Sequence, residues 1–262
     1  MNILVGDVGA TNTRLAIMSK DELVFVKKYR TSSITSFSQV VNSFLQEAGI
    51  AGFTTNTAAF GVAGPHNEYS ITLHNAKLTV SVSELLIRTA LEYVRIANDV
   101  YCVAKEHDQL VISVGTGLGA ALGSQPLEAG HLLFAAQSKS HQELVSWLES
   151  EIHRPIEYEH VLSGAGWLRV YEFLRQKHFV DAPAHSSPHN LSNDSSVCKQ
   201  ESVKLFSEVL AQFISQIQKL TSQTDVLLCG GVLQKNPSLA GSYQEVLSSD
   251  EHITLFSARC LL

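Results

Sequence analysis

The chain has 262 residues, of which 45% are hydrophobic and 17% charged, and its formal net charge is −6. This length allows one large domain or two modest ones with real cores, and the acidic balance argues against nucleic acid or an anionic membrane as a partner. No segment approaches the roughly 20 apolar residues of a membrane helix, and Asp7 and Arg14 interrupt any signal-peptide core. The four cysteines are widely spaced, so we expect a reduced, cytoplasmic globular protein.

The first half of the chain alternates strand-like and helix-like patterns. Short apolar runs predict strands at residues 3–5, 15–17, 23–29, 58–63 and 94–99. Apolar side chains at helical spacing predict a helix over residues 36–48 and another that begins at Ser83 and carries apolar residues as far as Val94. The first of these strands is followed closely by a carboxylate, Asp7, and the last ends on another, Asp99.

The second half repeats the opening order of a strand, a glycine turn and a returning strand. Strands are predicted at residues 110–114, 120–122, 226–229 and 252–258, and helices at 143–152, 166–176 and 201–221. The polar segment 178–196 is predicted to be a surface loop, with or without order. Strands that alternate with helices indicate an α/β protein. The repeated opening suggests two related α/β domains.

Three glycine turns follow apolar strands: DVGAT at Asp7–Thr11, GTGLG at Gly115–Gly119 and CGGV at Cys229–Val232. Glycine permits positive φ and leaves backbone N–H groups open to an anion. A P-loop is excluded because no glycine is followed by the required lysine and hydroxyl residue. A Rossmann turn at Gly115 is disfavoured, because Gly123 and Pro126 leave no room for its helix.

A phosphate clamp at the first turn remains. Asp7 could hold Mg²⁺ through water, since this ion keeps several waters and accepts few carboxylates. Gly9, Thr11 and Asn12 would then offer an N–H, a hydroxyl and an amide to phosphate oxygens. Alternatively, Asp7 only caps a turn, where aspartate is favoured in any protein. Spacing alone leaves both interpretations open.

Six motifs in order resemble those of bacterial-type glucokinases, in the hexokinase/actin-like ATPase superfamily. They are GDVGATNTRLA from Gly6, IAND from Ile96, GTGLGAAL from Gly115, EAGH from Glu128, EHVLSGAG from Glu159 and CGGVL from Cys229. The resemblance implies a two-domain actin-like ATPase (ribonuclease H-like) fold, with ATP and sugar in the cleft between the lobes. The expected domains are residues 1–99, a small α/β domain, and residues 100–262, a large one.

The resemblance also assigns roles to individual residues. For ATP it implies a first phosphate loop at Asp7, Gly9, Ala10, Thr11 and Asn12, a second at Gly115, Thr116 and Gly117, and adenosine contacts at Gly230 and Gly231. For the sugar it implies Asn75, Asn98, Asp99, Glu128, His131 and Glu159, with Asp99 as the catalytic base. A carboxylate that takes the sugar hydroxyl's proton contributes about 10²–10⁴ in rate.

Structural interpretations of the same residues stay open at this stage. Asp99 could cap the next helix, Glu128 and Glu159 could be surface acids, and His131 could be a hydrogen-bonded core histidine. The chain ends soon after the strand predicted at 252–258, so the family's C-terminal helix, which packs on the small domain, is expected to be missing. No cysteine cluster follows His131, so no structural zinc is expected. His178, His185 and His189 lie in the predicted surface loop.

The expected activity is ATP-dependent phosphorylation of a hexose, D-glucose first, with Mg²⁺ as cofactor, as in glycolysis. A type III pantothenate kinase shares the D-x-G-x-T-N opening, but EAGH and VLSGAG favour a sugar kinase. The third reading is a catalytically weak sugar-binding regulator, against which the presence of Asp99 counts. The expected partners are the hexose and ATP, without nucleic acid or membrane, and a homodimer is left open.

Overall fold

The computed structural model describes residues 1–65, 67–73, 76–246 and 252–262. Among these residues, the first of two units contains 1–109, 121–126 and 252–262, and the second contains 110–120 and 127–246. This division differs from a boundary after Asp99, because the helix that begins there and the last helix of the chain both pack on the first unit's sheet. No described helix has the length and apolar character needed to span a membrane.

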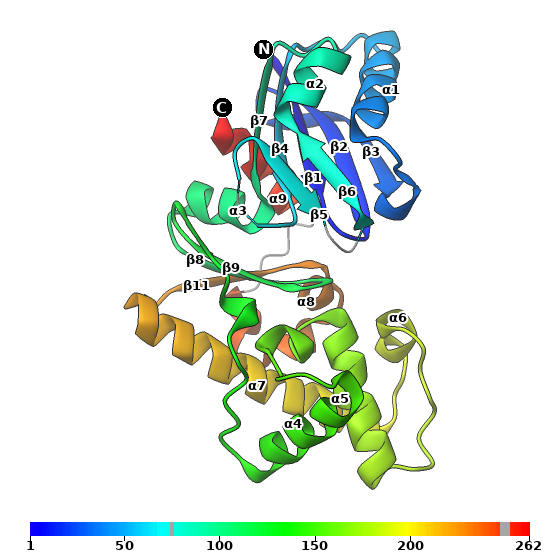
Figure 1. The fold of residues 1–262 in the computed structure, drawn as a ribbon, viewed down its shortest axis with the longest axis vertical. Helices are drawn as coiled ribbons and strands as arrows, with labels where there is room; N and C mark the ends of the chain where they lie inside the picture. The colour runs from blue at the N-terminus through cyan, green and yellow to red at the C-terminus, as the bar shows by residue number, and fades with distance from the viewer. Residues whose placement is uncertain (66, 74–75, 247–251) are drawn as a thin grey trace. The chain divides into compact units, whose positions relative to one another are not determined.

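The first unit is built on a five-stranded sheet with the order β3-β2-β1-β4-β7 (Figure 1). Its strands are β1 Asn2–Val8, β2 Asn12–Ser19, β3 Glu22–Arg30, β4 Thr57–Val62 and β7 Tyr93–Asn98. β1, β2 and β3 are antiparallel neighbours, whereas β4 pairs in parallel with β1 and β7. The five predicted strands are confirmed. The register sets Asp7 of β1 between Arg14 of β2 and Gly61 of β4.

The helices of the first unit are α1 Phe37–Ile50, α2 Val82–Arg88, α3 Asp99–His107 and α9 Ile253–Ala258. Ser36 caps α1 by accepting a hydrogen bond from the Gln39 N–H. The predicted helix from Ser83 to Val94 is too long: α2 ends at Arg88, and Val94 belongs to β7. A two-stranded sheet, β5 Ser70–Leu73 with β6 Leu78–Ser81, was not predicted, because its strands have four residues each.

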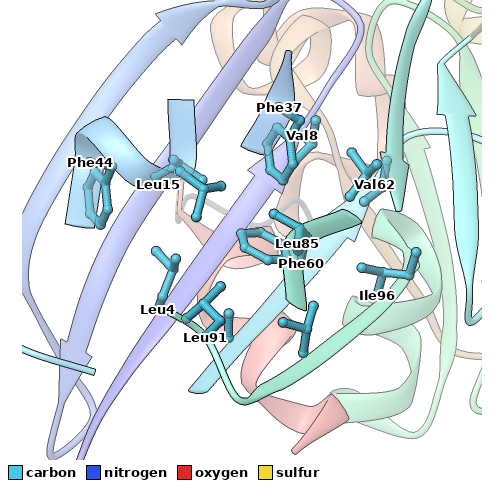
Figure 2. Packing of buried hydrophobic residues seen from close by; sticks show 14 of the residues in the cluster. Leu4, Val8, Leu15, Phe37, Phe44, Phe60, Val62, Leu85, Leu91 and Ile96 are labelled. Carbon is cyan, nitrogen blue, oxygen red and sulfur yellow. The ribbon is translucent and has the colours of Figure 1, made fainter. Parts of the chain in front are cut away.

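The first unit's sheet is buried on both faces. Leu4, Leu15 and Phe60 point into a core shared with α1 and α2, where Figure 2 shows them beside Phe37 and Phe44. The alternate positions Val5, Ala16 and Ala59 lie in a separate cluster with Leu255 and Ala258 of α9. Successive strand residues point to opposite faces, so Asp7 and Gly61 share the face that α9 covers.

The C-terminal segment corrects two predictions. Residues 252–258 were expected to form a strand, and the family's C-terminal helix was expected to be missing. Instead, α9 spans Ile253–Ala258, continues into the 3₁₀ turn η6 at Arg259–Leu261, and packs on β1, β4 and α3. Arg259 donates to Glu106 of α3 at 3.0 Å. A short run of apolar or small residues does not distinguish a buried helix from a strand. The segment Ile253–Ala258 is a helix because it packs as one on the sheet of the first unit.

The second unit contains a parallel pair, β8 Leu110–Val114 with β11 Val226–Cys229, within a four-stranded sheet of order β10-β9-β8-β11. The other two strands, β9 Leu118–Leu122 and β10 Gln125–Leu127, belong to the second unit only in part, because residues 121–126 group with the first unit. The helices are α4 Lys139–Ile152, α5 Gly164–His178, α6 Pro188–Ser192, α7 Val197–Thr221 and α8 Gly231–Lys235, followed by the 3₁₀ segment η5 Pro237–Val246. The predicted helices within α4, α5 and α7 are confirmed.

The polar segment 178–196 is more structured than predicted. It contains α6, and its Asp194 carboxylate bonds the His185 ring at 2.7 Å. The Tyr171 hydroxyl donates to the same carboxylate at 3.1 Å, and the Asp194 side chain is only 5% exposed. The polar composition of this segment did not indicate that it is ordered. Its order comes from side-chain hydrogen bonds to one buried carboxylate, whereas composition indicates order mainly through apolar residues that form a core.

Candidate functional site

The first glycine turn joins β1 to β2 through Gly9, Ala10 and Thr11. The Gly9 N–H donates to the Asn12 carbonyl at 3.0 Å, so this N–H closes the turn and does not face an anion as predicted. Thr31 holds the turn from outside, because its hydroxyl donates to the Gly9 carbonyl at 2.7 Å and its N–H to the Thr11 carbonyl at 3.1 Å. The phosphate contacts predicted for Ala10, Thr11 and Asn12 stay predictions.

Asp7 is a buried carboxylate with one cationic neighbour. Its side chain is 17% exposed, and its Oδ2 lies 3.6 Å from Nη1 of Arg14 on the adjacent strand. Burial and then the negative charge of Asp99 raise the pKa of Asp7, Arg14 opposes both effects, and the net result is a pKa of about 7. Asp7 therefore lies close to a second carboxylate, and this pair of acids would be stabilised by a cation.

Asn98 and Asp99 divide two roles at the start of α3. The Asn98 side chain caps the helix, because its Oδ1 accepts from the Tyr101 N–H at 2.9 Å, and its Nδ2 donates to the Gly64 carbonyl at 2.8 Å. The capping role considered for Asp99 thus belongs to Asn98. Asp99 is the first helical residue; burial raises the pKa of its carboxyl, while hydrogen bonds from the N–H groups of Val100 and of Asp99 itself lower it.

Gly61 is the residue that lets these groups approach the sheet. A Cβ at Gly61 would lie 3.3 Å from Cα of Asp99 and 3.3 Å from Cγ2 of Thr254 in α9. Gly61 is the register partner of Asp7, so β1, β4, α3 and α9 converge on this point. A glycine inside a predicted strand is a known sign of close backbone approach, and that signal in AFGVAG could have identified Gly61. Asn75, the remaining candidate in this half, lies outside the described residues.

In the second unit, Glu159 is bound to the second glycine turn. It lies in the 3₁₀ turn η4, Tyr158–His160, and its Oε2 accepts from the Leu118 N–H at 2.9 Å. A Cβ at Gly117 would lie 2.5 Å from that oxygen. Glycine at 117 is therefore required for the Glu159 carboxylate to sit against the turn. Glu159 is not a solvated surface acid.

His131 lies among three carboxylates. It ends the 3₁₀ turn η3, Ala129–His131, directly after Glu128, and its Nδ1 is 2.9 Å from Oε2 of Glu157. The hydrogen bond to Glu157 raises the pKa of His131, burial opposes the rise, and the charges of Glu159, Glu157 and Glu128 add to it. The His131 side chain is 59% exposed, so it is not a core histidine. The predicted residues Glu128, His131 and Glu159 are thus brought together.

Glu157 is a functional candidate that the sequence did not reveal. It has no motif of its own and stands two residues before Glu159 in IEYEH. Its hydrogen bond with His131 also lowers the pKa of the Glu157 carboxyl. By holding Nδ1, Glu157 orients the ring so that Nε2 is the nitrogen that can contact a ligand.

The VLSGAG and CGGVL motifs meet the second turn from two sides. The Gly164 N–H, at the start of α5, donates to the Gly115 carbonyl at 3.0 Å, and a Cβ on Gly164 would lie 3.3 Å from Cγ2 of Val232 in α8. Gly230 has φ +101° and would bring a Cβ to 2.4 Å from the Val114 carbonyl oxygen. Gly231, by contrast, has no atom within 4 Å of an added Cβ, which leaves room for a ligand beside its backbone.

Glycine turns follow β1, β8 and β11, and the acids Glu128, Glu157 and Glu159 cluster with His131, on a protein with the actin-like ATPase fold. The glucokinase family model matches residues 4–107 and 104–244. A glucokinase from Salmonella typhi is 27% identical over 268 residues, which cover 88% of this chain and 82% of that relative. The chain belongs to the glucokinase family.

Solved structures confirm the fold. The glucokinase from Balamuthia mandrillaris, in complex with glucose, matches with a TM-score of 0.78 at 17% identity, covering 99% of this chain and 93% of that one. The ROK family glucokinase from Streptomyces griseus, in complex with glucose and AMPPNP, matches with a TM-score of 0.71 at 13% identity, covering 98% of each chain. The predicted α/β actin-like ATPase fold and the family resemblance are both confirmed.

Proposed function

We propose that this protein transfers the γ-phosphoryl group of ATP to the 6-hydroxyl of a hexose, with D-glucose as the first candidate. Membership of the glucokinase family supports the reaction class, and the ligands named for the Balamuthia mandrillaris and Streptomyces griseus structures support glucose and an ATP-type donor. The observation that carries the proposal is Asp99, a partly buried carboxyl with a raised pKa at the first position of a helix that Asn98 caps.

Asp99 is proposed as the general base. A sugar hydroxyl is a poor nucleophile, and a carboxylate that accepts its proton during attack on phosphorus contributes about 10²–10⁴ in rate. A raised pKa brings the base closer to the operating pH, which favours proton transfer. The capping bonds of Asn98 fix the start of α3 and so fix the Asp99 backbone.

The sugar is proposed to be read by Glu128, His131 and Glu159. Carboxylates accept hydrogen bonds from hydroxyls. The His131 ring donates to Glu157 through Nδ1–H, so Nε2 accepts from a hydroxyl when the ring is neutral and donates to one when the ring is protonated. Glu159 has one oxygen bound to the Leu118 N–H, so its second oxygen is available to a hydroxyl. This arrangement ties sugar recognition to the second glycine turn, for which Gly115, Thr116 and Gly117 are the proposed phosphate contacts.

The ATP phosphates are further assigned to Ala10, Thr11 and Asn12 of the first turn, and the adenosine to Gly230 and Gly231. The residues present fit a magnesium ion, because Asp7 is a buried carboxylate beside Asp99 and Mg²⁺ needs only one or two protein carboxylates in addition to water and phosphate. No group of three or more potential metal ligands occurs among the described residues. When bound, the ion would neutralise charge on the transferring phosphoryl group.

A coupled assay with Mg·ATP and a panel of glucose, mannose, fructose, N-acetylglucosamine and pantothenate tests this proposal. We expect turnover of glucose and none of pantothenate. Asp99→Asn should lower kcat by about 10²–10⁴ while sugar binding, measured by calorimetry, changes little. Asp225→Asn makes the same chemical change at an exposed position and serves as the control. Folded protein that phosphorylates none of the sugars would refute the proposal.

A further inference from the structure

Two thiols that are far apart in the sequence meet on the first unit. Cys102 lies in α3, three residues after Asp99, and is fully buried, whereas Cys260 lies in η6 and is partly exposed. The Cys260 thiol donates to the Cys102 backbone carbonyl at 3.4 Å, across 158 residues of chain. The two side chains also hydrogen-bond to each other. Neither cysteine is in a disulfide.

We propose that Cys102 and Cys260 form a reversible disulfide when the protein meets a peroxide, and that this bond locks the C-terminal helix onto α3. The inference concerns the first unit alone and goes beyond phosphoryl transfer. Without the bond, α9 and η6 are held by a small apolar cluster and by the polar contacts of Arg259 with Glu106 and Asp21 and of Ser257 with Glu106. A covalent link would remove the local opening that such a terminal segment otherwise undergoes.

The surroundings of the two sulfurs distinguish their roles. The hydrogen bond with Cys102 lowers the pKa of Cys260, burial and Glu106 oppose this, and the positive charges of Lys105 and Arg259 reinforce it. The same hydrogen bond, burial and the negative charge of Asp99 raise the pKa of Cys102. The thiolate is the reactive form. Cys260 is also the more exposed of the two thiols, so it is the sulfur that reacts first with an oxidant from solvent, and Cys102 is the resolving thiol.

The chemistry balances with hydrogen peroxide as the only oxidant. The Cys260 thiolate attacks one peroxide oxygen, the O–O bond breaks, and hydroxide leaves, so Cys260 becomes a sulfenic acid. The Cys102 sulfur then attacks the Cys260 sulfur, the S–O bond breaks, and the departing hydroxide takes the Cys102 proton and leaves as water. Two thiols are oxidised by two electrons, and one peroxide is reduced to two waters. A dithiol reductant reverses the bond.

The test uses the full-length protein, first reduced, then treated with stoichiometric hydrogen peroxide and digested without reductant. We expect mass spectrometry to find one cross-linked species that joins the Cys102 and Cys260 peptides and disappears with dithiothreitol. Hydrogen–deuterium exchange should slow in the α9 peptide of the oxidised protein, and Tm should rise by at least about 5 °C. Cys102→Ser and Cys260→Ser should abolish these changes, and Cys198→Ser, at another buried thiol, should preserve them.

Two results would overturn the inference. One is oxidation of Cys260 to a sulfinic acid, or a mixed disulfide, without any link to Cys102. The other is a cross-link that forms equally well in denatured protein, which would show that the fold does not direct the pairing. Neither readout uses phosphoryl transfer, so a failure here is distinguishable from a failure of the proposed kinase activity.

Discussion

At pH 8, replacing Asp7 with asparagine should make the first unit more stable, even though Asp7 is a proposed part of the phosphate site. The pKa of Asp7 is raised from 3.8 to about 7 in the folded protein. Between these values the folded protein holds a proton that the unfolded chain has released. The free energy of unfolding therefore falls as the pH rises from about 4 to about 7, and it stays low above that range.

The size of this effect follows from the two pKa values. Their difference, 7 minus 3.8 or about 3, corresponds to about 4 kcal/mol, since one pKa unit equals about 1.4 kcal/mol. The Asp7 side chain is only 17% exposed, so solvent screens little of this energy. Asparagine cannot ionise. Asp7→Asn and the wild type should thus have similar stability near pH 4 and differ by about 4 kcal/mol at pH 8.

The measurement must report on the first unit, whereas both tryptophans, Trp147 and Trp167, lie in the second unit. Native-state hydrogen exchange of peptides from β1 and β4, followed across this pH range, meets that need. Asp225→Asn, at an exposed position, serves as the matched control. A constant difference between Asp7→Asn and the wild type from pH 4 to pH 8 would refute the argument that burial and Asp99 raise the pKa of Asp7.

Two further variants test the second unit. Gly117→Ala would place a Cβ 2.5 Å from Oε2 of Glu159 and so break the hydrogen bond of Glu159 with the Leu118 N–H. We expect the KM for sugar to rise about tenfold, which corresponds to a loss near 1.4 kcal/mol. Steady-state kinetics tests this, with Gly49→Ala as the control, because a Cβ added at Gly49 meets no atom within 4 Å. Glu157→Gln removes the hydrogen bond that is the largest cause of the raised pKa of His131. His131 should then lose its proton at a lower pH, so the pH above which sugar affinity declines should move lower, and kcat should change less than KM. An unchanged pH profile would contradict a positioning role for Glu157.

The sequence could predict the strands and their glycine turns because both leave local signals. β8 and β11 are short apolar runs between turn residues, and their bounds agree with the prediction at residues 110–114 and 226–229. The acids Glu128 and Glu159 could be assigned only through the family resemblance, since an isolated glutamate has no local pattern. Their proximity to His131 depends on how η3 and η4 pack, which spacing along the chain does not encode.

The errors share another physical cause. α9 and the segment around α6 are both stabilised by contacts distant in sequence: α9 by the sheet face that carries Val5 and Ala59, and the segment around α6 by hydrogen bonds to Asp194 from Tyr171 and His185. Local propensity is a weak prior in such places, because tertiary contacts override it. The Asn98 cap is similar, since aspartate and asparagine are equally good caps and only the backbone geometry distinguishes Asn98 from Asp99.

Glycine occupies the motif positions for two different physical reasons. The difference between them indicates which glycines a ligand can approach. Gly130, Gly166 and Gly230 are each required by packing, because an added Cβ would lie 2.4 Å or less from a backbone oxygen of Leu118, Val161 or Val114. Gly115 and Gly231 have open space at the same position. Open space alone does not mark a ligand site, since Gly49 in α1 has it too, but directly after β8 and β11 it leaves the backbone accessible to the proposed phosphate and adenosine. Among the glycines predicted to contact ATP in the second unit, Gly115 and Gly231 are therefore the better candidates for contact, whereas Gly117 and Gly230 are needed for the shape of the turns around them.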